Sequence, residues 1–226
     1  MQKLATAFER RTTADVVFEQ LHREIVSLEL LPGTKLSEAE VARRFGTSRQ
    51  PVREAFGRLG NLDLLLVQPQ KATTVRGFSL ELVAHARFVR LSVELEVVAQ
   101  ACAVWDTTRT DALHHNLDQQ RQVLAAGQIE EFHTLDGQFH TLICELANCT
   151  IAIAAISNCR QKIDRLCSLS LANQKEADIL LKDHELLANA LDKGSQAEAV
   201  AITRQHLSRL DNTIAQIHQT HSEYFE

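Results

Sequence analysis

Apolar residues recur at three- and four-residue spacing along most of this chain, and that spacing predicts amphipathic helices. The first such segment covers residues 13–29 and begins at Thr13, a candidate N-cap. Its predicted inner stripe consists of Val16, Val17, Leu21, Ile25 and Leu28. The polar residues between them leave the other face for solvent, so this helix is expected to pack against a neighbouring element.

Two shorter helices are predicted next, after a Pro-Gly turn in LPGTKL (31–36). Ser37 and Glu40 have the spacing of a capping box, and Gly46 is a typical helix terminator. The second helix is expected to have Ser48 as its N-cap, because Pro51 then falls in the first turn, where no intrahelical N–H is required. Two short helices joined by a tight turn that contains glycine indicate a helix-turn-helix.

Short β-prone runs follow this pair of helices. Residues 64–68 and 73–76 are predicted strands, with a turn at Pro69, Gln70 and Lys71. A small hairpin in this place is a wing, so the first part of the chain is predicted to be a winged helix-turn-helix.

Strand signals are missing from about residue 79 onward, and helical periodicity replaces them. The six predicted helices span about 79–103, 108–126, 128–146, 150–171, 175–192 and 196–221. The predicted breaks fall at 106–108, Gly127, Asn148, Asn173 and 192–195. The fold class is therefore mainly α. A winged helix-turn-helix domain is expected over residues 1–77, and an antiparallel all-helical bundle is expected over residues 78–226.

Charge separates the same two parts. Residues 1–77 hold 12 basic and 9 acidic residues, a net charge of +3, whereas the remainder holds 12 basic and 20 acidic residues, a net charge of −8. This asymmetry fits two domains with different partners, although chance alone also produces such a difference.

Cysteine usage and hydropathy bear on the compartment. The five cysteines lie in apolar surroundings without a C-x-x-C pair, which predicts free thiols in a reducing compartment: Cys102, Cys144, Cys149, Cys159 and Cys167. No apolar run approaches the roughly 18 residues of a membrane span, and the first residues lack the apolar core of a secretory signal. A cytoplasmic protein without a membrane partner is expected.

Arginine gathers in the predicted second helix of the helix-turn-helix. Arg49 and Arg53 lie four residues apart near its N-terminus, away from the apolar stripe that Val52, Ala55 and Phe56 belong to. The N-terminal residues of a recognition helix reach base edges in the major groove, and arginine suits both guanine edges and phosphates. A single arginine is more often solvated surface, but this cluster in a winged helix favours DNA binding.

The sequence then resembles a known family. It is similar to the winged helix of GntR-type bacterial transcription regulators in the run LPGTKLSEAEVARRFGTSRQPVREAFGRL, which carries the PGT-x-L-SE-x-E-V-A and SR-x-PVREA blocks. The helical second part resembles the FadR-like subgroup, whose effector-binding domain is called FCD. The chain departs from the usual pattern at Gln50, Asp63 and Ala72, where the family often has Thr, Gly and Gly.

This resemblance implies a homodimer that binds a short palindromic operator in double-stranded DNA and is released or tightened by a small ligand. It implies no enzymatic activity. The DNA-binding residues that it implies are Arg43, Arg49 and Arg53, with Ser48 and Gln50 near the backbone or bases and the wing tip Gln70-Lys71 near the minor groove.

Histidines provide a second candidate site, in the bundle. Asp136 and His140 lie four residues apart on one helix face. His184 and His206 lie on the last two predicted helices at similar distances from the turn between them, so their rings are able to face each other. One carboxylate and three imidazoles suit Zn²⁺, Ni²⁺ or Mn²⁺.

The four positions also match the metal-binding FCD pattern residue by residue. Any single histidine is more often a core or surface residue, and His133 is a weaker extra candidate on the same face as His140. A divalent cofactor is expected, with Zn²⁺ or Ni²⁺ favoured and Mn²⁺ as an alternative.

Effector contacts rest on the resemblance alone. The R-x-x-x-E step of FCD domains matches Arg90 and Glu94, so Arg90 either pairs with a carboxylate held on the metal or forms a structural ion pair with Glu94. Asn148 matches a frequent pocket residue, or is only a helix terminator. The predicted function is a regulator controlled by a small organic acid. The alternatives are a regulator that senses the metal itself and, less favoured, a helical metalloenzyme.

Overall fold

A computed structural model of the chain describes residues 11–68, 71–170 and 174–226, with some side chains near the end of the fourth bundle helix and in the last helix left out. The chain divides between Phe78 and Ser79 into two compact units. Pro69, Gln70 and Asn173, on which predicted turns fall, lie outside the described residues, as does the side chain of Cys167.

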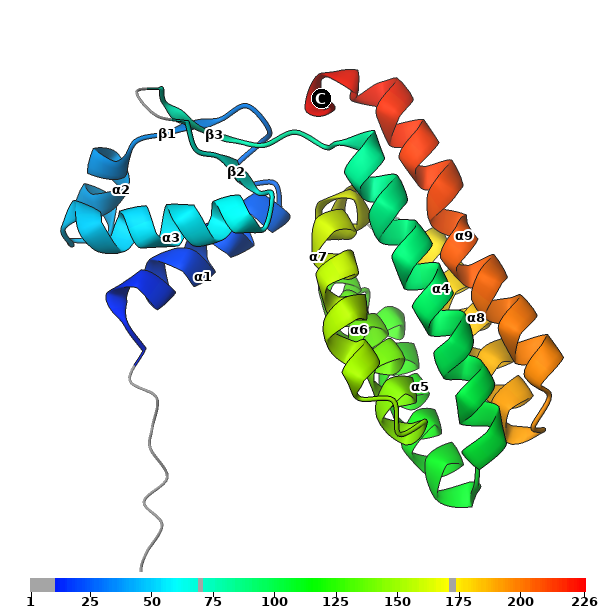
Figure 1. The fold of residues 1–226 in the computed structure, drawn as a ribbon. Coiled ribbons are helices and arrows are strands. Elements are labelled where there is room, and N and C mark those ends of the chain that lie inside the picture. The colour runs from blue at the N-terminus through cyan, green and yellow to red at the C-terminus, as the bar shows by residue number, and fades with distance from the viewer. Residues whose placement is uncertain (1–10, 69–70, 171–173) are drawn as a thin grey trace, which may run out of the picture. The chain divides into compact units, whose positions relative to one another are not determined.

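The first unit is a winged helix-turn-helix, as predicted. It contains α1 (Thr13–Val26), β1 (Lys35–Leu36), α2 (Glu38–Arg44), α3 (Arg49–Asn61), β2 (Leu65–Leu66) and β3 (Thr73–Val75). The helix α3 packs against both α1 and α2, and Figure 1 shows α1 and α3 lying side by side. Its core includes Leu21, Ile25, Val52, Phe56 and Leu59, none more than 1 % exposed.

The wing has one strand more than the sequence predicts. The sheet order is β1-β3-β2, with both pairs antiparallel and Leu36 opposite Thr73. Lys35 and Leu36 fall in the predicted turn of residues 31–36, because a two-residue strand has no periodicity of its own. Its identity comes from pairing with a segment almost 40 residues away, which local pattern does not reveal.

Two predictions for α1 are wrong in detail. Thr12, not Thr13, is the N-cap, and it forms a capping box with Asp15 in which the Asp15 amide lies 3.1 Å from Thr12 Oγ1. Val16 is 47 % exposed, so it does not belong to the buried stripe. Leu28 lies beyond the helix end, with a positive φ of 63°. The buried face of α1 is therefore shorter than the apolar pattern indicates.

The start of α3 agrees with the interpretation of Pro51. Ser48 takes the extended conformation of an N-cap, and Pro51 is the third residue of the helix, where its missing N–H costs no helical hydrogen bond. Ser37 also takes the N-cap position of α2, but its side chain caps no backbone N–H, so the predicted capping box with Glu40 is absent. Gly46 ends α2 with a φ of 61°, which glycine adopts without strain.

Asp63 occupies the position where the family often has glycine. Its φ is 59°, in the left-handed region that Asp tolerates better than most residues with a side chain. The Asp63 carboxylate lies 3.0 Å from Arg76 Nη1, which fixes the turn between α3 and the wing.

The second unit is a helical bundle that begins with α4. Its described helices are α4 (Leu80–Val104), α5 (Thr107–Ala125), α6 (Ile129–Leu146), α7 (Ile151–Ser170), α8 (Gln174–Asp192), α9 (Gln196–Thr220) and the short η1 (Ser222–Tyr224). The helix α4 packs against α7 and α9, while α5 packs against α6 and α8 (Figure 1). All six predicted bundle helices are present, with ends that differ from the predicted ones by at most one residue.

Short side chains and positive φ values end these helices where the sequence predicts. Gly127, Asn148 and Gly194 have φ values of 71°, 58° and 64°. The main bundle core contains fully buried apolar residues from five of the helices: Ala101, Leu113, Leu117, Phe139, Leu191 and Ala199.

Two further expectations concern chemistry rather than topology. Cys102, Cys144, Cys149 and Cys159 are free thiols in the described structure, and burial raises the pKa of Cys144 to about 12. Among the described residues, every helix is too short or too polar to serve as a membrane span.

Candidate metal centre and DNA-binding surface

Four predicted ligands come together inside the bundle. Asp136 and His140 lie one turn apart on α6, His184 comes from α8, and His206 comes from α9. One donor atom of each residue lies within 4.8 Å of the others, and all four side chains are buried. No predicted ligand is left out of this cluster, whereas the extra candidate His133 lies outside it and packs edge-on against Phe132.

The packing of the rings explains how the helices hold this geometry. Phe139, which precedes His140 on α6, stacks on the His184 ring with the two centroids 4.2 Å apart. The His140 and His206 rings lie with their centroids 5.2 Å apart. The apolar core therefore continues up to the edge of the polar cluster, and little freedom remains for the imidazoles to rotate.

A second polar residue lies beside the outer nitrogen of each histidine, although His206 Nδ1 makes no hydrogen bond among the described residues. His140 Nδ1 lies 2.7 Å from Glu94 Oε2, and His184 Nδ1 lies 2.9 Å from Gln120 Oε1. His206 Nδ1 lies 3.5 Å from Asp183 Oδ2. An acceptor at Nδ1 favours the tautomer in which Nε2 has its lone pair free, which is how such partners orient metal-binding histidines.

These outer partners are themselves held in place. Glu94 Oε1 accepts a hydrogen bond of 2.5 Å from Arg90, and Gln120 donates one of 2.6 Å to Asn116. Asp183 is paired with Arg209, whose Nη2 lies 2.9 Å from Asp183 Oδ1. Because Gln120 donates to Asn116, its amide oxygen is the atom that faces His184.

The inner atoms fit a bound cation. His184 Nε2 is buried and has no hydrogen-bond partner among the described residues, although Asp136 Oδ1 lies 3.4 Å away. His140 Nε2 and His206 Nε2 face each other at 3.3 Å, so two lone pairs point toward one another when Nδ1 carries the proton on both rings. A buried nitrogen without a partner is costly, and a divalent ion between these atoms removes that cost.

Electrostatics favour the forms that bind metal. Burial lowers the pKa of His140, His184 and His206, which keeps the imidazoles neutral at neutral pH. Burial alone raises the pKa of Asp136, but the Arg160 guanidinium and the nearby histidines outweigh it and hold that pKa well below its usual value. The cluster therefore offers three neutral nitrogens and one carboxylate.

The carboxylate depends on a glycine beside it. Arg160 Nη1 on α7 donates a hydrogen bond of 2.6 Å to Asp136 Oδ2, which leaves Oδ1 directed to the histidines. The guanidinium lies directly over Gly137, where an added Cβ would be 3.3 Å from Arg160 Nη2. A side chain at position 137 would therefore compete for the space that Arg160 uses to reach Asp136.

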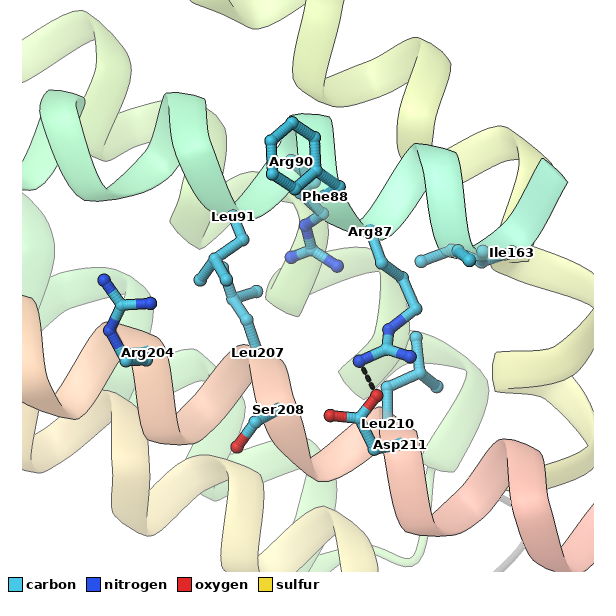
Figure 2. A pocket seen from close by; sticks show the side chains of 11 residues that line it. Arg87, Phe88, Arg90, Leu91, Ile163, Arg204, Leu207, Ser208, Leu210 and Asp211 are labelled. Atoms are coloured by element: carbon cyan, nitrogen blue, oxygen red, sulfur yellow. Dashed lines mark ion pairs between the residues drawn. The ribbon is translucent and has the colours of Figure 1, made fainter. Parts of the chain in front are cut away.

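The two predicted effector residues lie in different surroundings. Arg90 is buried, forms the ion pair with Glu94, and lines a cavity between α4 and α9 (Figure 2). Asn148 is exposed where α6 ends, and it lines neither that cavity nor the small one beside Glu94 and His140. Its positive φ accounts for Asn148 as a helix terminator, so the structure gives no support to it as a pocket residue.

The predicted DNA-binding residues that the structure describes are all exposed to solvent. Six of them have exposed side chains: Arg43, Ser48, Arg49, Gln50, Arg53 and Lys71. Arg43 and Arg49 have no ion-pair partner within 4.0 Å among the described residues. The wing-tip residue Gln70 lies outside the described part of the chain.

Arg53 differs from the other two arginines. Its guanidinium makes a bidentate contact with Glu38 at the start of α2. Arg53 Nε lies 3.1 Å from Glu38 Oε1, and Arg53 Nη2 lies 2.9 Å from Glu38 Oε2. Hydrogen bonding to Arg53 lowers the pKa of Glu38, so this carboxylate is ionised at neutral pH. Arg58, the third arginine of α3, is instead held by Asp15 and by the Phe18 ring.

Sequence reasoning missed the residues that orient the site. Gln120, Asp183 and Arg160 were not candidates, and neither was Glu38. Only Asp183 carries a local signal, because it directly precedes His184 in the sequence. The others act across 15 to 64 residues of chain, so only the folded structure identifies them.

A winged helix-turn-helix joined to a helical bundle with a buried histidine cluster defines a class of bacterial transcription regulators. A family model for gntR-family bacterial regulatory proteins matches residues 13–75, and a model for the FCD domain matches residues 86–209. The chain belongs to the GntR family of bacterial regulators and has a C-terminal FCD domain. It is therefore a DNA-binding transcription regulator with an effector domain.

Named relatives agree with this assignment. The HTH-type transcriptional repressor RspR of Escherichia coli K12 is 34 % identical over 209 residues, which is 92 % of each chain. A regulator in an unstable DNA locus of Streptomyces ambofaciens is 30 % identical and covers 95 % of this chain and 90 % of its own. The solved structure of E. coli McbR/YncC has the same fold, with a TM-score of 0.72 at 22 % identity over 93 % of this chain and 99 % of its own.

Proposed function

We propose that this regulator binds a palindromic operator as a homodimer, and that a small organic acid controls its operator affinity through a metal site in the bundle. The observation that carries the proposal is the convergence of Asp136 Oδ1 with the inner nitrogens of three buried histidines, one of which has no hydrogen-bond partner. His140 and His184 also have close acceptors at their outer nitrogens, and such partners are typical of metal ligands.

The donor set indicates which ions fit. Asp136, His140, His184 and His206 would hold the ion, and imidazole with carboxylate suits Zn²⁺ or Ni²⁺, with Mn²⁺ as an alternative. When bound, the ion would supply a Lewis-acidic site to which a carboxylate oxygen binds. Arg90 is the cationic residue that would attract an anionic ligand. Its guanidinium lines a cavity and hydrogen-bonds to Glu94, whose other carboxylate oxygen contacts His140.

The DNA-binding half of the proposal rests on exposed cations. Arg43 and Arg49 are free to meet phosphates or guanine edges, and Lys71 extends the positive surface to the wing. Arg53 reaches the same surface while held by Glu38. The acid would act by changing the relative stability of DNA-competent and DNA-incompetent states of the dimer. Coupling of about 1–3 kcal/mol corresponds to about 5- to 150-fold in operator affinity.

The experiment begins with an operator selected from random DNA by the purified full-length protein. Operator binding is then measured by fluorescence anisotropy for chelated protein, for protein with Zn²⁺, Ni²⁺ or Mn²⁺, and for each form with a panel of small carboxylates. We expect a shift of at least about fivefold that needs both metal and acid. A shift produced by metal alone would overturn the acid as effector and identify the metal as the signal.

Variants connect the response to the site. His184→Ala should abolish both the response to acid and tight metal binding, while its matched control His85→Ala, an exposed histidine on α4, should retain both. Circular dichroism checks that His184→Ala is folded. His206→Gln serves as a second variant, because glutamine is closer than alanine to histidine in side-chain volume. An acid response that survives in both variants contradicts the proposed metal site.

A further inference from the structure

A cavity of about 250 Å³ lies between α4 and α9, apart from the four clustered metal ligands (Figure 2). Its wall includes Arg87 and Arg90 from α4, Ile163 from α7, and Arg204 and Asp211 from α9. None of the four clustered metal ligands lines it. The cavity is therefore a separate compartment from the histidine cluster.

The cavity carries an excess of positive charge. Three arginines line it: Arg87 pairs with Asp211, as the dashed line in Figure 2 shows, and Arg90 pairs with Glu94, so Arg204 supplies the excess charge. Arg204 is exposed and has no ion pair among the described residues. Arg87 Nε is buried and makes no hydrogen bond there, so one cationic donor is left over even with Asp211 in place.

The remaining wall is apolar. Leu91, Leu207 and Leu210 lie between the arginines, and Ile163 is only 1 % exposed. Phe88 also lines the cavity while 72 % of it remains exposed, which is unusual for so large an apolar side chain. A phosphate or sulfate ion would satisfy the arginines but leave this apolar surface uncovered.

We propose that the cavity between α4 and α9 binds a small organic acid with one carboxylate and an apolar body, such as an aromatic or short-chain carboxylic acid. The carboxylate would pair with Arg204, which has no ion pair among the described residues, because guanidinium binds carboxylates through paired N–H donors. The apolar body would lie against the leucines and Phe88. A volume of about 250 Å³ admits a benzoate-sized molecule but excludes larger cofactors.

Arg90 connects this cavity to the histidine cluster. Its guanidinium hydrogen-bonds to Glu94 Oε1, and Glu94 Oε2 contacts His140 Nδ1. Arg90 therefore lies between a bound acid and the histidine cluster, so occupancy of the cavity and binding of metal should affect each other, and such coupling is reciprocal.

The cavity site does not depend on the proposed metal-bound effector, and the experiment separates the two. The full-length chain is stripped of metal with a chelator, and binding of benzoate is measured by saturation-transfer NMR and equilibrium dialysis. Benzyl alcohol has the ring without the charge, and acetate and inorganic phosphate have the charge without the ring. We expect benzoate to bind metal-free protein about tenfold more tightly than any of the three.

Variants locate the binding. Arg204→Ala should weaken benzoate binding about tenfold or more, whereas Lys193→Ala, an exposed cation of the same unit before α9, should leave it unchanged. Leu207→Glu should abolish binding, because it places a negative charge against the ligand. Circular dichroism confirms that each variant is folded.

The outcomes that overturn the site are distinct from those that overturn the metal proposal. Benzoate that binds no better than acetate, or as well to Arg204→Ala as to the unchanged chain, overturns the cavity site. Binding that disappears with chelator and in His184→Ala moves the acid to the metal and also overturns it. An unchanged Zn²⁺ affinity at saturating benzoate overturns the link through Arg90, Glu94 and His140.

Discussion

The arginines of the first unit and the histidines of the second are both clusters of polar side chains, but the protein holds them in opposite ways. The Arg53 side chain is 63 % exposed and its contact with Glu38 lies at the surface, while Arg43 and Arg49 face solvent. His184 has no exposed surface, and the Gln120 amide and the Asp136 carboxylate lie beside its two ring nitrogens.

This difference determines how each cluster affects binding and stability. Exposed cations keep their charge and cost the fold little, so their role is decided by the molecule that approaches them. A buried cluster must be satisfied inside the protein, because an unpaired charge or polar atom there costs several kcal/mol. Substitutions should therefore change only binding in the first unit, but both binding and stability in the second.

The largest effect is expected from Asp136→Ala. It removes the carboxylate donor and breaks the ion pair with Arg160, whose Nη1 lies 2.6 Å from Asp136 Oδ2. Loss of one partner of a buried ion pair costs about 3–5 kcal/mol, so the free energy of unfolding should fall by about that amount, as measured with urea. Asp118→Ala is the matched control, because its ion pair with Arg121 is exposed. A loss below about 1 kcal/mol would show that the buried cluster is no more demanding than the surface.

Gln120→Leu should have the next largest effect, and on metal binding above all. It removes the acceptor that holds His184 Nδ1 while leaving all four ligands in place. Loss of an outer partner lowers metal affinity about 10- to 100-fold, which competition against a chromogenic chelator measures. Gln122→Leu, an exposed substitution on the same helix, should bind metal as before. Equal affinities for the two variants would remove the outer partners from the explanation.

Arg49→Ala should affect DNA binding without affecting the fold. A contact to a base edge is worth about 1–3 kcal/mol, and a contact to phosphate lowers the salt slope of binding by about one. The free energy of unfolding should change by less than about 0.5 kcal/mol, because Arg49 is exposed and has no ion pair among the described residues. Arg23→Ala on α1 controls for loss of surface charge. Unchanged operator binding would exclude Arg49 from the DNA-binding surface.

Glu38→Gln is expected to have the smallest effect on stability, below about 1 kcal/mol, because its ion pair with Arg53 is exposed. Its effect on recognition should be larger. Without the carboxylate, Arg53 loses its fixed orientation while the surface becomes more positive, so binding to unrelated DNA should rise and the ratio of operator to unrelated DNA should fall. Glu54→Gln, an exposed change on α3, is the control. A preserved ratio would mean that Glu38 does not position Arg53.

The same contrast explains how much the sequence could predict. The helices of the bundle follow from local periodicity, and Asp136 and His140 follow from their spacing on one helix. The strand β1 and the exposure of Val16 depend on distant pairing and packing, which local pattern does not contain. The outer partners of the histidines lie even further away, since His184 and Gln120 are 64 residues apart.

The DNA-binding surface was easier to predict for a physical reason. Arg49 and Arg53 stand four residues apart on α3, so a few residues of sequence place both on one face of a helix. The hydrogen bonds from Arg53 to Glu38 could not be predicted from the sequence, because they join α3 to α2. Residues that act by themselves can be found from sequence, while residues that orient others are found from the fold.

Gly137 has a consequence that reaches beyond its own backbone. Arg160 lies across this glycine to neutralise Asp136, so the empty space at position 137 determines how much negative charge the histidine cluster meets. The methyl group of Gly137→Ala would push against the Arg160 guanidinium and weaken its contact with Asp136. The histidine cluster would then meet more of the negative charge of Asp136, although no ionisable group is added or removed. Steric bulk at one helix position would thus serve as a tuning element for the electrostatic potential of the bundle interior.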